Sequence, residues 1–239
     1  MSAAGRRRLE VLADAAALAT HVAGWMAEKA AASADFVVAL SGGTTPRLLY
    51  ETLAGEPFGH EIDWSRTFWF WGDERFVPAD DPANNARTAR EALLSRVPVP
   101  ENRIFPIPTA VADVNAAAAV YERTLRDFAA RNSAHAQLLF DVTLLGLGED
   151  GHTASLFPAS AALAEREHWV AGARGPAGDA RVTLTIPTLE RSRSVAFLVT
   201  GAGKRAVLQR LLRGDPSLPA AHLNPLGDLT IFCDAAAAG

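Results

Sequence analysis

Four short segments combine glycines, hydroxyls and charged side chains in patterns that suit an anionic substrate and acid–base chemistry. They are residues 41–46 (SGGTTP), 72–78 (GDERFVP), 146–153 (GLGEDGHT) and 201–204 (GAGK). Each follows an apolar run that is typical of a buried strand. Because ligands of open parallel sheets bind beyond the carboxyl ends of the strands, we expect the four segments to meet at one site.

The segment 146–153 gives the strongest indication of catalysis. Its glycines lead from a predicted strand to His152, which Glu149 and Asp150 precede. Histidine titrates near neutral pH and often acts as a general base, and a neighbouring carboxylate can fix its tautomer. We therefore interpret His152 as a general base that Asp150 or Glu149 holds in place. The alternative is a glycine-rich turn with an exposed histidine of no function.

The segment 41–46 is a candidate phosphate-binding loop. Its glycines allow the backbone to approach a ligand, and its hydroxyls can donate hydrogen bonds ahead of a predicted helix start. These residues are Ser41, Gly42, Gly43, Thr44 and Thr45. The segment matches neither GxxxxGK[ST] nor GxGxxG, so no nucleotide is specifically indicated. An ordinary strand–helix turn with a hydroxyl cap is the alternative.

Charged side chains in the two other segments could complete an anion site. Arg75 and Lys204 can bind a phosphate, the arginine through its forked guanidinium. Asp73 or Glu74 could move a proton or orient another group. The alternative for both segments is a solvated surface of little energetic consequence. No HExxH pattern or comparable ligand cluster is present, so we expect no metal site.

The composition favours a globular protein without a disulfide framework. The chain has 239 residues, is 49% hydrophobic and 21% charged, and contains one cysteine, Cys233. Lys plus Arg number 23 against 27 Asp plus Glu, a net charge of −4 that indicates neither a nucleic-acid nor a membrane partner. No uncharged run approaches the roughly 20 residues that span a bilayer. We expect a cytoplasmic monomer or weak homo-oligomer that binds a small molecule.

The hydrophobic pattern predicts one α/β domain over residues 1–239, built on a mostly parallel, twisted sheet with helices on both faces. A polar loop is predicted at 72–81, and a hairpin or flexible loop between two strands at 172–180. Helices are predicted at about 10–33, 46–54, 84–96, 113–131 and 203–213, and strands at 36–40, 67–71, 103–107, 140–145, 169–171, 182–186, 195–200 and 229–233.

Taken together, the segments resemble the 6-phosphogluconolactonase family. The resemblance rests on SGGTTP, WGDERFVP, NNARTARE, LLGLGEDGHTASLFP and TGAGKR, which occur in the family's order between about residues 34 and 233. It implies the Rossmann-like α/β fold that the family shares with glucosamine-6-phosphate deaminase. It also implies hydrolysis of 6-phospho-D-glucono-1,5-lactone to 6-phosphogluconate, a step of the oxidative pentose phosphate pathway that needs no cofactor.

The resemblance also assigns roles to individual residues. The family's general base falls on His152 beside Asp150, its phosphate loop on residues 41–45, its arginine on Arg75, its asparagine on Asn85 and its late lysine on Lys204. Near the C-terminus the family often carries a basic residue after LPAS-type sequence. Here residues 218–225 read LPAAHLNP, and His222 is the candidate substitute.

Two other functions fit the same segments. Resemblance to the deaminase predicts a glutamate five residues after the histidine, but Phe157 occupies that position and cannot accept a proton. The fold also serves as a sugar-phosphate sensor in some transcriptional regulators, without catalysis. The absence of a basic stripe argues against such a DNA-linked role.

Overall fold

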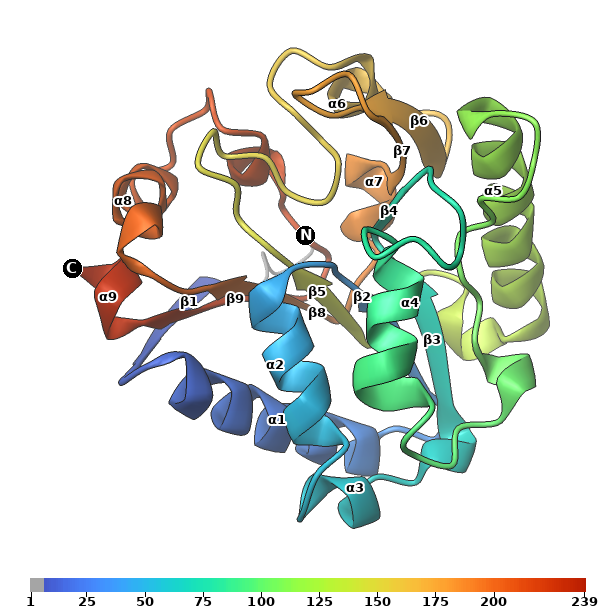
Figure 1. Cartoon of the computed structure of the whole chain (residues 1–239), viewed down its shortest axis with the longest axis horizontal. Helices are drawn as coiled ribbons and strands as arrows, with labels where there is room; N and C mark the ends of the chain where they lie inside the picture. The colour runs from blue at the N-terminus through green and yellow to red at the C-terminus, as the bar shows by residue number, and fades with distance from the viewer. Residues whose placement is uncertain (1–6) are drawn as a thin grey trace.

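The centre of the fold is a sheet of six parallel strands, in the order β1-β9-β8-β5-β2-β3 (Figure 1). The structure, a computed structural model, describes residues 7–239. The strands are β1 (Arg7–Leu12), β2 (Phe36–Leu40), β3 (Thr67–Trp71), β5 (Val142–Leu145), β8 (Ser194–Val199) and β9 (Asp228–Asp234). Every residue of β2, β5 and β8 is buried, so both faces are covered at the centre. The predicted mostly parallel sheet is confirmed.

A second, antiparallel sheet begins directly beyond β3. Its order is β4-β7-β6, with β4 (Asp73–Arg75), β6 (Val170–Arg174) and β7 (Ala180–Leu184). Gly72 joins the two sheets, because its N–H donates to Leu40 and its carbonyl accepts from Leu184, both at 2.8 Å. The predicted polar loop at 72–81 is therefore wrong at 73–75. Three charged residues are too few for the alternation that reveals a strand in sequence.

The helices surround the large sheet and the small one. In Figure 1, α1 runs along the lower side, α2 and α4 lie in front, and α5 stands at the right beside the small sheet. The helices are α1 (Ala15–Ala32), α2 (Thr44–Leu53), α3 (Phe58–Glu61), α4 (Asn85–Ala89), α5 (Val114–Arg131), α6 (Ala161–Ala164), α7 (Ile186–Leu189), α8 (Arg205–Leu212) and α9 (Ala235–Ala238). Among residues 7–239, no helix is both long and apolar enough to cross a membrane.

Several predicted elements differ in extent from the structure, and two differ most clearly. The helix expected at 10–33 begins only at Ala15, where the Asp14 side chain accepts a hydrogen bond from the N–H of Ala17 at 2.8 Å and caps the first turn. The residues before this cap form β1, the edge strand beside β9. The strand expected at 103–107 is a single bridge between Ile104 and Trp69. The hairpin between β6 and β7 is confirmed.

Candidate active site

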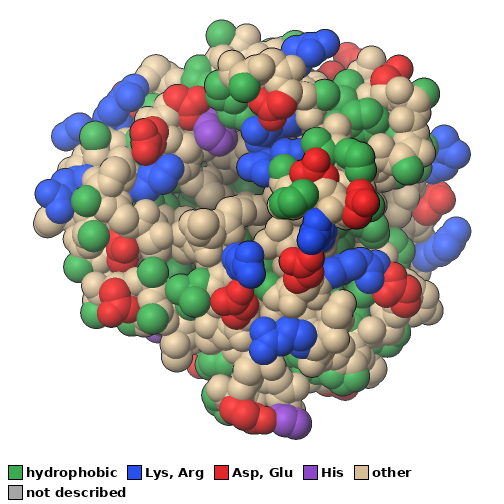
Figure 2. Space-filling view, viewed as in Figure 1, with side chains coloured by type: hydrophobic (Ala, Val, Ile, Leu, Met, Phe, Trp, Pro, Cys, Tyr) green, Lys and Arg blue, Asp and Glu red, His purple; other side chains and the backbone are tan. Residues whose placement is uncertain are grey.

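The four segments singled out in the sequence meet around one cavity of about 280 Å³. They follow β2, β3, β5 and β8 at their carboxyl ends, where loops of a parallel sheet converge. Ten of the eleven predicted site residues line this cavity: Ser41, Gly42, Gly43, Thr44, Thr45, Asp73, Arg75, Asn85, His152 and Lys204. Figure 2 shows a hollow in the upper half of this face, with basic and histidine side chains around it.

The eleventh residue, Asp150, is hydrogen-bonded to the ring of His152. Its Oδ1 lies 2.5 Å from His152 Nδ1 and 3.1 Å from the backbone N of the same residue. Burial raises the pKa of Asp150, but the hydrogen bonds from His152 outweigh this effect and hold the pKa below its ordinary value. The charged carboxylate favours the tautomer with a proton on Nδ1, which makes Nε2 the acceptor. Glu149 lies elsewhere, near Gly203.

The turn that brings Asp150 to His152 requires glycine at position 148. A Cβ at Gly148 would lie 2.1 Å from His152 Nδ1 and 2.7 Å from Asp150 Oδ1. The turn is closed by hydrogen bonds from Gly148 N–H to the carbonyl of His152 and from Gly151 N–H to that of Gly148. This glycine therefore serves the close approach of side chains.

The loop that carries His152 is anchored on the small sheet. The Ser155 hydroxyl donates to Asp73 Oδ2 at 2.6 Å, and the Ser155 N–H donates to Thr183 Oγ1 at 3.3 Å. Between them and the histidine, Ala154 lines the cavity with a φ of +48°. This left-handed conformation costs an alanine roughly 1–2 kcal/mol, and such strain is concentrated at functional sites.

The phosphate-loop candidate leads into α2 without a side-chain cap. Gly43, the N-cap residue, has a φ of +112° and no side chain that could bond the first turn. Gly42 is needed for space, since a Cβ there would lie 2.0 Å from Asn85 Oδ1. Thr45 Oγ1 lies 2.6 Å from Thr200 Oγ1, which joins this loop to the segment that carries Lys204. The first turn of α2 thus presents backbone donors at the cavity.

Glu74 holds the backbone that carries two of the cavity residues, Arg75 and Asn85. Its fully buried carboxylate accepts hydrogen bonds from the N–H groups of Arg75, Asn85 and Ala86, at 2.7–2.8 Å. Burial raises the pKa of Glu74 to about 7, against the effect of these donors. The sequence does not decide whether Asp73 or Glu74 moves a proton or orients another group in the site. Only Asp73 lines the cavity.

Arg181 also lines the cavity, although no local sequence pattern indicates it. It is the cross-strand partner of Arg75 in the β4–β7 pair, and both side chains line the cavity. Like charges directly opposite each other destabilise a strand pair, so this arrangement favours negative charge beside both arginines, and the Asp179 carboxylate supplies part of it. Arg181 is also paired with Asp179 at 2.6 Å, while Arg75 Nε is buried without a partner among the described residues. Only recognition of β4 as a strand could have revealed the pair.

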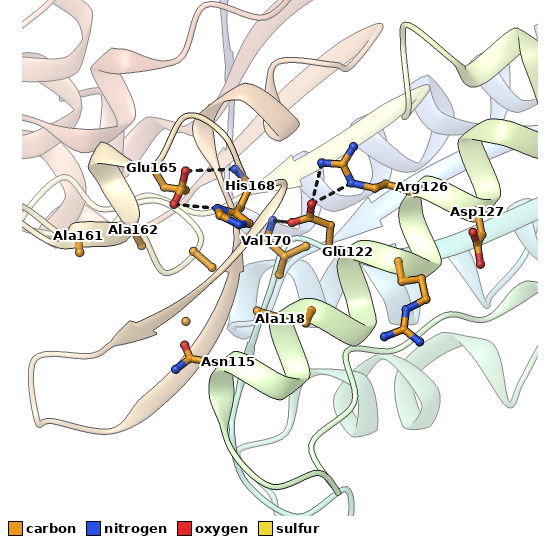
Figure 3. A pocket seen from close by; sticks show the side chains of 14 residues that line it. Asn115, Ala118, Glu122, Arg126, Asp127, Ala161, Ala162, Glu165, His168 and Val170 are labelled. Carbon is orange, nitrogen blue, oxygen red and sulfur yellow. Dashed lines mark hydrogen bonds and ion pairs between the residues drawn. The ribbon is translucent and has the colours of Figure 1, made fainter.

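Three further places carry no chemistry for this site. The ring of Phe157 packs against that of His152, with centroids 4.5 Å apart. His222 does not line the cavity, and its Nε2 lies within hydrogen-bond distance, 2.8 Å, of the Pro216 carbonyl oxygen. A larger hollow of about 660 Å³ lies between α5 and β6 (Figure 3). The carboxylates of Glu122 and Glu165 there are already hydrogen-bonded to backbone N–H groups and to the side chains of Arg126 and His168.

Comparison with known proteins identifies the family. The family model described as glucosamine-6-phosphate isomerases/6-phosphogluconolactonase matches residues 12–231. The chain belongs to this family. A 6-phosphogluconolactonase of Synechocystis sp. is 44% identical over 82% of this chain and 81% of its own length. That of Mycobacterium tuberculosis is 37% identical over 86% of this chain and 85% of its own length.

Solved structures of the family agree with this assignment. The 6-phosphogluconolactonase from Trypanosoma cruzi is 32% identical, with a TM-score of 0.85 over 99% of this chain and 97% of that one. The enzyme from Thermotoga maritima is 30% identical, with a TM-score of 0.82 over 96% and 100%. A monomeric glucosamine-6-phosphate deaminase, 20% identical with a TM-score of 0.83, shares the fold. Both the family resemblance and the Rossmann-like fold expected from the sequence are confirmed.

Proposed function

We propose that this chain hydrolyses 6-phospho-D-glucono-1,5-lactone to 6-phosphogluconate, with His152 as the general base. The observation that carries the proposal is the hydrogen-bonded pair of His152 and Asp150 at a cavity whose other lining residues include anion-binding groups. Relatives that are 37–44% identical bear the name of this activity. A lactone carbonyl is already electrophilic, so the reaction needs a held substrate, a positioned water and a base.

The proposed reaction begins with water at C1 of the lactone. His152 Nε2 removes a proton as the water oxygen attacks, and Asp150 stabilises the imidazolium that forms. The tetrahedral intermediate then breaks the bond between C1 and the ring oxygen. The leaving oxygen takes the proton from His152 and becomes the hydroxyl of the open acid. Such acid–base assistance is typically worth about 10² to 10⁴ in rate.

The phosphate is proposed to lie on residues 41–45, with Arg75, Arg181 and Lys204 around it. The uncapped start of α2 and the facing arginines support this placement. Binding energy from the phosphate, which does not react, orients the lactone for attack at C1. Asp73, with one oxygen on Ser155, is proposed to accept a hydrogen bond from a sugar hydroxyl.

The test is an assay of lactone disappearance with the purified chain. 6-Phosphogluconolactone is generated in place from glucose 6-phosphate by its dehydrogenase, and its decay is compared with the spontaneous rate. We expect strong acceleration with this lactone and no ammonia from glucosamine 6-phosphate. Decay at the spontaneous rate in the presence of folded protein would reject the proposal. Ammonia release would support the deaminase instead.

A further inference from the structure

Two buried tyrosines hold the ends of neighbouring strands in the same way. The Tyr50 hydroxyl, from α2, donates to the carbonyl of Ser41 at 2.6 Å and accepts from the Ser41 N–H at 3.0 Å. The Tyr121 hydroxyl, from α5, donates to the carbonyl of Trp71 at 3.1 Å and accepts from its N–H at 2.8 Å. Neither tyrosine is more than 1% exposed. Each hydroxyl thus satisfies both backbone groups of one residue.

The chain that follows Trp71 has further anchors. The backbone of Gly72 is hydrogen-bonded to those of Leu40 and Leu184, and the next three residues pair with β7. Loss of the Tyr121 hydroxyl would therefore leave the direction of this segment fixed.

The chain that follows Ser41 depends more strongly on its tyrosine. It turns at once into the cavity, and the first helical hydrogen bond, from Arg47 N–H to the Gly43 carbonyl, lies beyond the turn. The side-chain contacts of this turn are with Asn85 at Gly42 and with Thr200 at Thr45. Tyr50 comes from the same helix whose first turn faces the cavity, so its hydroxyl links the position of the helix to the position of the loop.

We propose that Tyr50 is a positioning residue for phosphate recognition, which it serves by fixing Ser41 and hence the anion-binding turn at residues 42–45. The proposal rests on the proposed function of this site. Tyr50→Phe keeps the buried ring and removes only the hydroxyl. The N–H and carbonyl of Ser41, a residue only 7% exposed, then lack their partner. The turn must shift to satisfy them, which moves the donors that face the phosphate.

Tyr50→Phe and the matched control Tyr121→Phe are compared in three measurements. Calorimetry gives the Kd of 6-phosphogluconate, and steady-state assays give kcat and KM for 6-phosphogluconolactone and for unphosphorylated glucono-1,5-lactone. Thermal unfolding reports the loss of stability in both variants. All assays are run well below the lower unfolding temperature, so that both variants are folded.

For Tyr50→Phe we expect Kd and KM for the phosphorylated ligands to rise about tenfold, with kcat changed by less than about twofold. The kcat/KM for the unphosphorylated lactone should stay constant. Tyr121→Phe should lower the unfolding temperature and leave all these constants near those of the wild type.

Three results would overturn the proposal. The first is an unchanged Kd of 6-phosphogluconate in Tyr50→Phe. The second is an equal fall in kcat/KM for the phosphorylated and the unphosphorylated lactone in that variant. The third is the same loss of affinity for 6-phosphogluconate in Tyr121→Phe. A wild-type chain that neither binds 6-phosphogluconate nor hydrolyses its lactone would instead reject the proposed function itself.

Discussion

Gly148→Ala tests whether the placement of His152 limits turnover. The added Cβ would lie 2.1 Å from His152 Nδ1, whereas ordinary contacts begin at 3.4 Å. The ring must therefore retreat by about 1.3 Å, or the loop must open by as much. A displacement of about 1 Å at a reacting group can cost about 10² in rate. We expect kcat for the lactone to fall by about 10², with the Kd of 6-phosphogluconate changed far less because the anion loop is a separate segment.

Gly146→Ala is the matched control in the same loop. A Cβ at Gly146 would meet nothing within 4 Å, although this residue also lines the cavity. The lactone assay gives kcat for both variants, and calorimetry gives the affinity for product. Near-normal turnover in Gly148→Ala would show that the position of His152 does not limit turnover. An equal loss of kcat in Gly146→Ala would show that any added methyl in this loop is harmful.

Three further predictions concern groups around the site. Arg181→Ala should weaken 6-phosphogluconate binding about tenfold in calorimetry, because one cation of the facing pair is lost; unchanged affinity would remove Arg181 from the phosphate site. Ser155→Ala should lower the free energy of unfolding in urea by about 1–3 kcal/mol, since Asp73 loses its donor; a negligible change would show that the bond is dispensable. The pKa of Glu74, about 7, lies above its ordinary value of 4.5, so this group stabilises the fold below about pH 4.5 and loses that contribution as pH rises through 7. The free energy of unfolding of the wild type, measured relative to that of Glu74→Gln in urea titrations, should therefore fall by about 3 kcal/mol between pH 4.5 and 8. A difference between the two proteins that does not change with pH would show that the pKa of Glu74 is not raised.

Strands that are buried on both faces could be predicted from the sequence, because a short apolar run such as Phe36–Leu40 that ends in glycines is typical of such a strand. The loops that follow them were predictable for the same reason. The short charged strand Asp73–Arg75 was not, since its pairing with β7 depends on residues more than 100 positions away. The start of α1 was misplaced because apolar residues of β1 happen to continue the helical spacing, and only the cap at Asp14 separates the two elements.

The cavity residues predicted from the sequence lie on the segments that follow strands, except Asn85, which begins α4. The supporting residues do not follow that rule. Tyr50 lies within α2, Glu74 is directed away from the cavity into backbone donors, and Arg181 reaches the site only through its register with Arg75. Contacts of this kind depend on tertiary packing, which no local pattern encodes.

In the proposed reaction, His152 activates water on a substrate that other residues hold. The most direct measurement compares kcat for 6-phosphogluconolactone in the wild type and in His152→Ala, with the Kd of 6-phosphogluconate measured for both. We expect kcat to fall by about 10² to 10⁴ in His152→Ala, with the affinity for product retained within a few-fold. Turnover in His152→Ala close to that of the wild type would exclude His152 as the general base.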